Sequence, residues 1–269
     1  MLMSAKGYRR RELRAYANLM RRPSDDRRRL LIFAQGRTGS TVLEDLLCST
    51  GYFSGNGELL GANGEGVRFA PQFLEGLARG EDDKHFICHV KIYQLLQDRQ
   101  RAGARPVEPA PFLRKLNSYG WKIVHLKRKD MFRHFLSGQL ARARGGYHKR
   151  DDTPEAFTFE IERRSMAQVM RRRARWTRRE IRALKGIPHL TLTYEDNLQD
   201  SNVQQATVNE VLDFVDLEKR DAETRLRKIN RRPLEETISN YSDVKRWWKE
   251  IVEEIEHENA GERQLSHTA

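Results

Sequence analysis

Apolar residues form four short continuous runs along the chain, at 30–35, 86–92, 121–128 and 189–194. Runs of this length are typical of strands that are buried on both faces of a parallel sheet. Between the runs, apolar residues recur at the three- and four-residue spacing of amphipathic helices. We expect helices at 8–22, 42–50, 71–79, within 94–117, and at 130–144, 154–184, 203–215 and 234–256.

This alternation of strands and helices predicts an α/β protein with a P-loop-like three-layer fold, in which helices flank a central parallel sheet. We expect one such domain over 28–256, preceded by a basic helical arm at 1–27 and followed by a disordered tail at 257–269. The glycine-rich stretch 52–61 lacks a regular pattern and is expected to run irregularly over the sheet. In folds of this class, ligands bind at the carboxyl ends of the strands.

The first strand leads into the sequence Gly-Arg-Thr-Gly-Ser-Thr at 36–41, and a helix follows. A strand, a tight glycine loop and a helix direct backbone N–H groups and a helix dipole toward an anion. Arg37 adds a fixed positive charge. A Walker A loop would have glycine in place of Ala34 and lysine in place of Ser40, so the lysine that reaches the β- and γ-phosphates of ATP is missing.

The net positive charge of the chain favours an anionic ligand or partner. The chain has 50 basic and 38 acidic residues, a net charge of +12. A nucleotide, an acidic glycan, a nucleic acid or an anionic membrane would each fit this charge. The sequence has no RNA-binding aromatic motif, Cys/His finger or recognisable helix-turn-helix, so nucleic acid is not expected.

Membrane and compartment signals are few. The sequence has no run of about 18 apolar residues, so no membrane span is expected. Residues 1–22 carry six arginines but no apolar core like that of a signal peptide, and they predict a basic helix able to lie on an anionic membrane. Cys48 and Cys88 stand in apolar surroundings without metal-ligand spacing. We therefore expect buried, reduced thiols, a cytoplasmic location and no metal site.

The loop at 36–41 closely resembles the 5′-phosphosulfate loop of sulfotransferases that use 3′-phosphoadenosine 5′-phosphosulfate (PAPS), particularly of the carbohydrate and bacterial lipopolysaccharide-type branches. The segment 125–130, with Ser137 on the helix that follows, resembles the 3′-phosphate site of that family. The resemblance covers roughly residues 30–245. It implies that Arg128 and Ser137 hold the 3′-phosphate.

Two further segments resemble the family. Tyr194-Glu195-Asp196 follows the last strand as in the family's Tyr-Glu-Asp-Leu segment, where the carboxylates are expected to pair with basic residues or cap the next helix. The stretch 238–241 resembles a C-terminal Ile-x-Asn-Tyr segment. A basic loop precedes it, and Arg232 of that loop is assigned to cofactor binding.

The resemblance implies transfer of the sulfuryl group of PAPS to a hydroxyl of a carbohydrate, glycolipid or related small molecule, with PAP as the product and no metal. By analogy with phosphoryl transfer, Arg37 and the loop amides would neutralise charge on the leaving phosphate. The expected cofactor-binding loop residues are Gly36, Arg37, Thr38, Gly39, Ser40 and Thr41.

The acceptor hydroxyl must lose its proton, so a base within hydrogen-bond reach is expected. Glu58 stands where the resemblance places the carboxylate that approaches the acceptor, and His89 on the second apolar run is the other candidate. Lys91 is expected to touch the transferring group. The acceptor-binding residues are expected in the least patterned segments, 52–83 and 145–170.

Two other functions stay open at this point. An apolar strand that ends in acidic residues, as at 190–196, can hold Mg²⁺ as a Walker B strand does, which suggests an ATP-dependent kinase. A nucleotide- or anion-binding protein without catalysis would also explain the loop and the charge.

Overall fold

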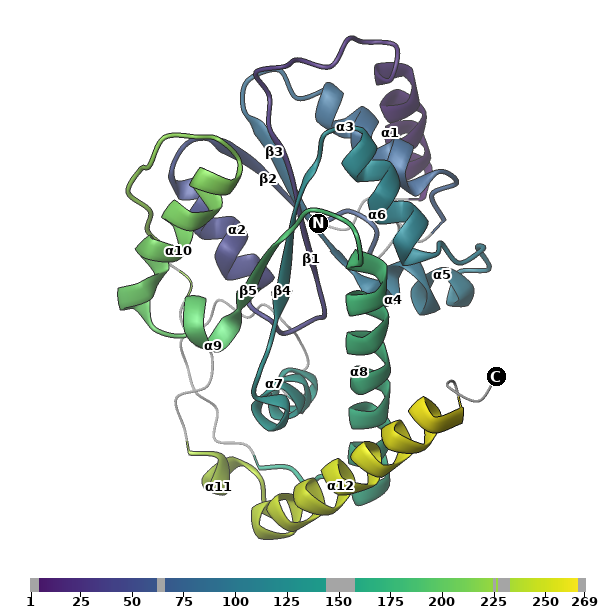
Figure 1. Ribbon diagram of the computed structural model, residues 1–269, viewed down its shortest axis with the longest axis vertical. Coiled ribbons are helices and arrows are strands. Elements are labelled where there is room, and N and C mark those ends of the chain that lie inside the picture. Colours follow the sequence, from purple (N-terminus) through teal and green to yellow (C-terminus); the bar gives the residue numbers. More distant parts are fainter. Residues whose placement is uncertain (1–4, 62–65, 144–157, 225, 227–232, 266–269) are drawn as a thin grey trace. The chain divides into compact units, whose positions relative to one another are not determined.

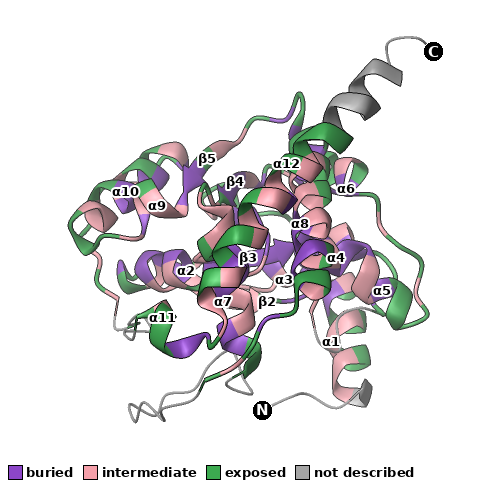
Figure 2. Cartoon of the chain, turned by 90° about the horizontal axis from the view of Figure 1, so that it is seen from below, coloured by how far each residue is buried: buried purple, intermediate pink, exposed green. Residues whose placement is uncertain are grey.

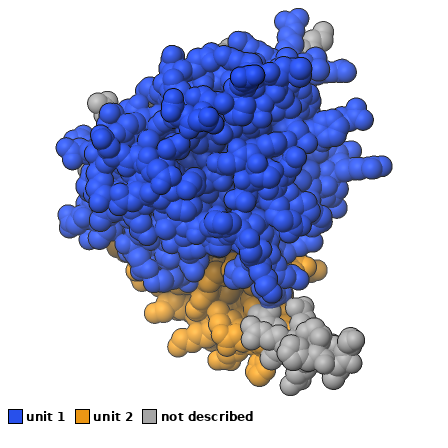
Figure 3. Space-filling model, turned by 45° about the horizontal axis from the view of Figure 1, so that its top comes forward, with its two compact units in different colours: residues 1–129, 178–226 blue, residues 130–177, 227–269 orange. Residues whose placement is uncertain are grey.

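The computed structural model describes residues 5–61, 66–143, 158–224, 226 and 233–265. The chain divides into two compact units, which Figure 3 colours separately. The first unit comprises Met1–Lys129 and Arg178–Leu226, and the second comprises Asp130–Thr177 and Arg227–Ala269. The sequence suggested one continuous domain over 28–256, whereas here the chain passes from one unit to the other three times, and the N-terminal arm belongs to the first unit.

The first unit contains a five-stranded parallel sheet, which confirms the predicted α/β class. Its strands are β1 (Arg29–Ala34), β2 (Phe53–Glu58), β3 (His85–Lys91), β4 (Lys122–Lys127) and β5 (Leu190–Thr193). Their order across the sheet is β2-β3-β1-β4-β5. The four predicted strands are all present within one or two residues of their expected bounds.

The fifth strand, β2, corrects the prediction of irregular structure at 52–61. It is an edge strand that pairs only with β3, and its register shifts between Gly55 and Glu58. A strand at the edge needs no continuous apolar run, because it is not covered on both sides as a central strand is. The apolar pattern therefore gave no sign of it.

The register brings the carboxyl ends of the strands to one edge of the sheet. Ala34 at the end of β1 lies opposite Lys91 of β3 and Leu126 of β4, and Glu58 of β2 lies opposite His89. The chain leaves β1 toward the β2–β3 side and leaves β4 toward β5. The order of strands thus reverses between β1 and β4, which is where ligands bind in such sheets.

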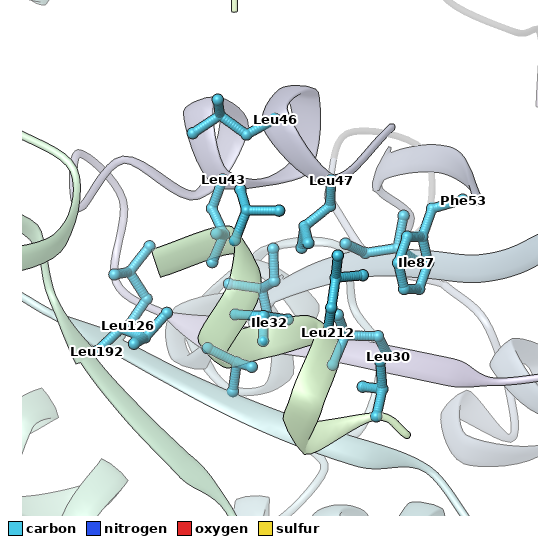
Figure 4. Close-up of a cluster of buried hydrophobic side chains, with 14 of the residues drawn as sticks. Leu30, Ile32, Leu43, Leu46, Leu47, Phe53, Ile87, Leu126, Leu192 and Leu212 are labelled. Atoms are coloured by element: carbon cyan, nitrogen blue, oxygen red, sulfur yellow. The ribbon is translucent and has the colours of Figure 1, made fainter. Parts of the chain in front are cut away.

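One face of the sheet packs against α2 (Ser40–Ser49) and α10 (Ser201–Phe214). Figure 4 shows Leu43 and Leu47 extending from α2 toward sheet residues that include Leu30 and Ile32 of β1. Because side chains alternate along a strand, the residues between them face the other layer. Burial on both faces explains the unbroken apolar run of β1, and Figure 2 shows the strands largely buried.

The other face is covered by α3 (Ala70–Arg79) and α6 (Pro109–Ser118), and Figure 1 shows these helices across the sheet from α2 and α10. The arm forms α1 (Ala5–Asn18) and packs on α3. A Cβ on Gly76 of α3 would lie 1.8 Å from the carbonyl oxygen of Ala15, so this close approach requires glycine. Between β3 and α6 lie the short helices α4 (Ile92–Leu95) and α5 (Gln97–Arg101).

The second unit is helical. It contains α7 (Met131–Ala143), residues 163–177 of α8 (Arg163–Leu184), α11 (Leu234–Thr237) and α12 (Tyr241–Leu265). Their shared core contains Phe135, Leu136, Met166, Met170, Val244 and Ile251. Ion pairs link α8 to α12 along its length, with Arg163 near Glu250 and Glu254, and Arg171 near Glu254.

Three helix ends in the second unit differ from the sequence expectation. Helix α8 begins at Arg163 rather than at Pro154, which lies outside the described residues, and the chain before it forms a bridge between Phe159 and Ile238. The same bridge separates α11 from α12, where one continuous helix was expected. Helix α12 extends to Leu265, into the segment expected to be disordered.

Among the helices that the structure describes, none is both long and apolar enough to span a bilayer.

Candidate active site

The loop after β1 has the backbone conformation that an anion site would require. Arg37 and Gly39 both have left-handed conformations, with φ of 71° and 90°, and the Thr38 hydroxyl donates to the Gln35 carbonyl at 2.9 Å. Gly39 then serves as the N-cap of α2, and no side chain of the described residues caps this helix end. The positive end of the α2 dipole therefore points to the carboxyl edge of the sheet.

Two tyrosines enclose this loop and explain its glycines. A Cβ on Gly36 would lie 2.7 Å from the Tyr93 hydroxyl, and a Cβ on Gly39 would lie 2.7 Å from the Tyr194 ring. Tyr93 follows β3, and Tyr194 begins the short helix α9 (Tyr194–Asn197) after β5. The loop conformation is thus fixed by chain segments on both sides of β1.

Lys91, at the end of β3, brings a cation to the loop from the neighbouring strand. It is 1% exposed, and its ammonium donates to the Ser40 hydroxyl. Burial lowers the pKa of Lys91 to about 8, and nearby carboxylates, Glu58 first among them, offset part of that effect. Ser40 occupies the place of the Walker lysine in sequence, so Lys91 supplies at this place the charge that the loop lacks.

Beside Lys91, two carboxylates flank a buried histidine. Nε2 of His89 lies 2.9 Å from Oε2 of Glu44 on α2, and Nδ1 of His89 lies 3.8 Å from Oε1 of Glu58 at the end of β2. Glu44 also accepts the Gly57 N–H at 2.7 Å, and Gln94 donates to Glu58. The His89 side chain is 3% exposed and that of Glu58 is 40% exposed, so Glu58 is the accessible member of this pair.

Arg128, just after β4, supports the loop from the other side. Its Nη1 donates to the Arg37 carbonyl at 3.2 Å, its Nε lies 3.1 Å from Glu195, and its guanidinium lies 4.5 Å from the centre of the Tyr194 ring. The Lys129 N–H also donates to Glu195. Burial would raise the pKa of Glu195, but the hydrogen bonds from Lys129 and from Arg128 hold it below its ordinary value.

Asp196 forms an ion pair with the Lys129 ammonium. Together with the Glu195 contacts, this pair confirms the prediction that the carboxylates after β5 pair with basic residues. Both carboxylates that could hold Mg²⁺ are therefore engaged by basic side chains.

The structure brings most of the predicted site residues to the carboxyl edge of the first unit. These residues are Gly36, Arg37, Thr38, Gly39, Ser40, Thr41, Glu58, His89, Lys91 and Arg128. Ser137 lies on α7 in the second unit, so its contact with a 3′-phosphate stays a prediction. Arg232 lies outside the described residues, as do 62–65 and 145–157 of the expected acceptor region.

Sequence reasoning missed Glu44, Gln94 and the cluster around Glu180. Gln35 donates to Glu180 at 3.2 Å, and His125 lies 3.6 Å from the same carboxylate. The sequence gave one indication of Glu44, because this carboxylate stands within the apolar pattern of α2. Gln94 and Glu180 gave none, because only the fold places them near the loop.

Comparison with known proteins finds no family model that matches this chain and no curated protein that matches it. Within the part of the chain that the structure describes, no group of three or more His, Cys, Asp or Glu residues is placed to hold a metal ion.

Proposed function

We propose that this protein is a sulfotransferase that moves the sulfuryl group of PAPS to a hydroxyl of a carbohydrate, glycolipid or related small molecule. One observation carries the proposal. The buried ammonium of Lys91 donates to Ser40, the first residue of α2, at the proposed anion-binding loop. The half-exposed carboxylate of Glu58 lies near it, at the end of the neighbouring strand β2. This arrangement combines an anion site with a base at one edge of the sheet.

The reaction requires charge neutralisation at the donor and proton removal at the acceptor. The loop amides and Arg37 would hold the 5′-phosphosulfate, and the Lys91 ammonium would face the group in transfer. Glu58 is the better candidate for the base, because His89 lies behind it and is almost fully buried. The new O–S bond forms as the S–O bond to the 5′-phosphate breaks and the acceptor proton moves to Glu58.

The kinase alternative receives less support. Lys91 could stand in for a Walker lysine, but Glu195 and Asp196, the residues that would hold Mg²⁺, are engaged by Arg128 and Lys129. A binding protein without catalysis explains the loop but gives no role to Glu58.

Thermal unfolding with PAP, PAPS, ATP and GTP, each with and without Mg²⁺, separates these functions. A ligand that binds only the folded state stabilises it in proportion to the logarithm of its concentration over Kd. We expect PAP and PAPS to raise the Tm in EDTA and to do so more than ATP with Mg²⁺. Loss of PAP binding in EDTA, or stronger stabilisation by ATP with Mg²⁺, would contradict the sulfotransferase proposal.

Compartment and partners belong to the same proposal. The structure holds Cys48 and Cys88 as free thiols, which fits a reducing, cytoplasmic location. Helix α1 exposes Arg9, Arg10 and Arg14, so a peripheral contact with an anionic membrane is compatible with its surface. A glycolipid acceptor would make such a contact useful.

A further inference from the structure

The buried histidine behind Glu58 has an arrangement that a purely structural residue does not need. His89 lies between two carboxylates, and its two ring nitrogens have different surroundings. Nε2 is 2.9 Å from Glu44, whereas Nδ1 is buried and has no hydrogen-bond partner among the described residues. Its nearest charged neighbour is Glu58, at 3.8 Å.

Glu44 determines which nitrogen carries the proton. Burial alone would raise the pKa of Glu44, but the hydrogen bonds from His89 and from the backbone of Gly57 and Asn56 hold it below its ordinary value. An ionised carboxylate only accepts hydrogen bonds, so Nε2 of His89 must be the donor. In the neutral ring, Nδ1 is then left with a lone pair that faces Glu58.

The position of Glu58 is also fixed. The side-chain amide of Gln94 donates through Nε2 to Oε2 of Glu58, and its Oε1 accepts the backbone N–H of Lys91 at 2.8 Å. A Cβ on Gly61 would lie 2.6 Å from the Gln94 amide nitrogen, so glycine at this position allows the chain to pass close by. With Oε2 held by Gln94, Oε1 is the oxygen that faces His89.

We propose that Glu44, His89 and Glu58 form a proton path in which Glu58 takes the acceptor proton and passes it to Nδ1 of His89. This inference rests on the proposed function. The acceptor O–H bond breaks as the O–S bond forms, and the proton moves from Glu58 to the lone pair of Nδ1. The resulting imidazolium lies between two carboxylates, and the proton returns through Glu58 to water when the product leaves.

This path has a chemical advantage over Glu58 alone. The imidazolium that forms is attracted by both carboxylates, Glu44 at 2.9 Å and Glu58 at 3.8 Å, which favours transfer of the proton to His89. Glu58 thereby regains its charge while the sulfate ester is still bound. His89 is then a proton acceptor that never touches the substrate, and Glu44 is a positioning residue that selects its tautomer.

The tautomer is measured without any substrate. Long-range proton–nitrogen correlation spectra of ¹⁵N-histidine-labelled protein, at a pH at which the His89 ring is neutral, should place the proton on Nε2. In the isosteric variant Glu44→Gln, which can donate as well as accept, the other tautomer should appear. A proton on Nδ1 in the wild-type protein would overturn the proposal, because that nitrogen could then accept nothing from Glu58.

The proton path itself is tested with ³⁵S-PAPS and a cell extract that supplies hydroxyl acceptors. We expect His89→Gln to slow transfer of label about 10–100-fold, near the lower end of general-base effects, while PAP binding is retained. Glu44→Gln should cause a smaller loss. His85→Gln is the matched control, since it changes a histidine of the same strand at the far end of the sheet and should leave the rate unchanged.

The two proposals can fail separately. If wild-type protein transfers no label from PAPS to the extract, the proposed function fails. If it does and His89→Gln, still stabilised by PAP, keeps the full rate, the proton path is wrong and Glu58 acts alone.

Discussion

Lys91 is unusual because its charged side chain is almost fully buried. A fully buried ammonium is costly unless other groups support it, and here the Ser40 hydroxyl and nearby carboxylates do so. Its depressed pKa means that the charge is present near neutral pH but easily lost above it. An anion bound at the loop would restore that charge by Coulomb attraction.

Affinity for a nucleotide phosphate should therefore fall as the pH rises through about 8, the pKa of Lys91 in the free protein. Calorimetric titration of PAP between pH 6.5 and 9.5 measures this, and Lys91→Met should remove most of the pH dependence. Lys122→Met is the control, because Lys122 begins β4 at the opposite edge of the sheet. An unchanged pH dependence in Lys91→Met would show that another group titrates.

The same shift predicts a trend in stability without any ligand. The unfolded chain keeps the Lys91 proton up to its ordinary pKa of 10.5, whereas the folded state loses it near 8. Between these values the unfolded state binds more protons, so this group makes the free energy of unfolding rise with pH. Lys91→Met should lose that rise, relative to wild type, in denaturant titrations across this interval.

Binding of the 3′-phosphate and support of the loop are two roles for Arg128, and a comparison of PAP with AMP, which lacks that phosphate, separates them. A charge-assisted contact to a phosphate contributes about 1.5–3 kcal/mol, so wild-type protein should bind PAP at least 10-fold more tightly than AMP. Arg128→Ala should lose most of that preference, and Ser137→Ala should lose part of it. Equal weakening of both nucleotides by Arg128→Ala would instead assign this arginine to the loop, through its bond to the Arg37 carbonyl.

Among the elements, the strand–loop–helix unit at 29–49 was the most predictable from sequence. Its strand is apolar because it is buried on both faces, and its glycines are required by close neighbours, so pattern and fold agree. Strand β2 was missed because an edge strand need not be apolar. The partners Glu44, Gln94 and Glu180 could not be predicted as a site, because tertiary packing alone brings them together.

The loop conformation offers a prediction at this scale. Gly39→Ala places a Cβ 2.7 Å from the Tyr194 ring at a residue with φ of 90°. The left-handed backbone alone costs about 1–2 kcal/mol for a residue with a side chain. We expect chemical denaturation to show a loss of at least that size, and PAP binding to weaken. Gly57→Ala is the comparison, since its φ of 60° is also left-handed but a Cβ there meets nothing within 4 Å. A loss in Gly39→Ala no larger than in Gly57→Ala would mean that the ring contact does not fix the loop.

At the scale of the whole molecule, the sequence predicted the fold class but not its division. Helix α8 runs through both units, and the pattern of a single long helix contains no sign of a boundary at Thr177. The second unit holds Ser137 and the segment before α11 that were assigned to the nucleotide. The roles assigned to Ser137 and Arg232 therefore stay predictions, which ligand binding can test.

The most direct test of the account is transfer of label from ³⁵S-PAPS to a cell extract in the presence of EDTA, with products separated by chromatography. We expect wild-type protein to label a hydroxyl-bearing compound. Arg37→Ala should lower the rate more than 10-fold and change PAP affinity much less, because charge on the leaving oxygen peaks in the transition state. An absence of labelled product, or a product formed equally well by Arg37→Ala, would contradict a sulfuryl-transfer site at this loop.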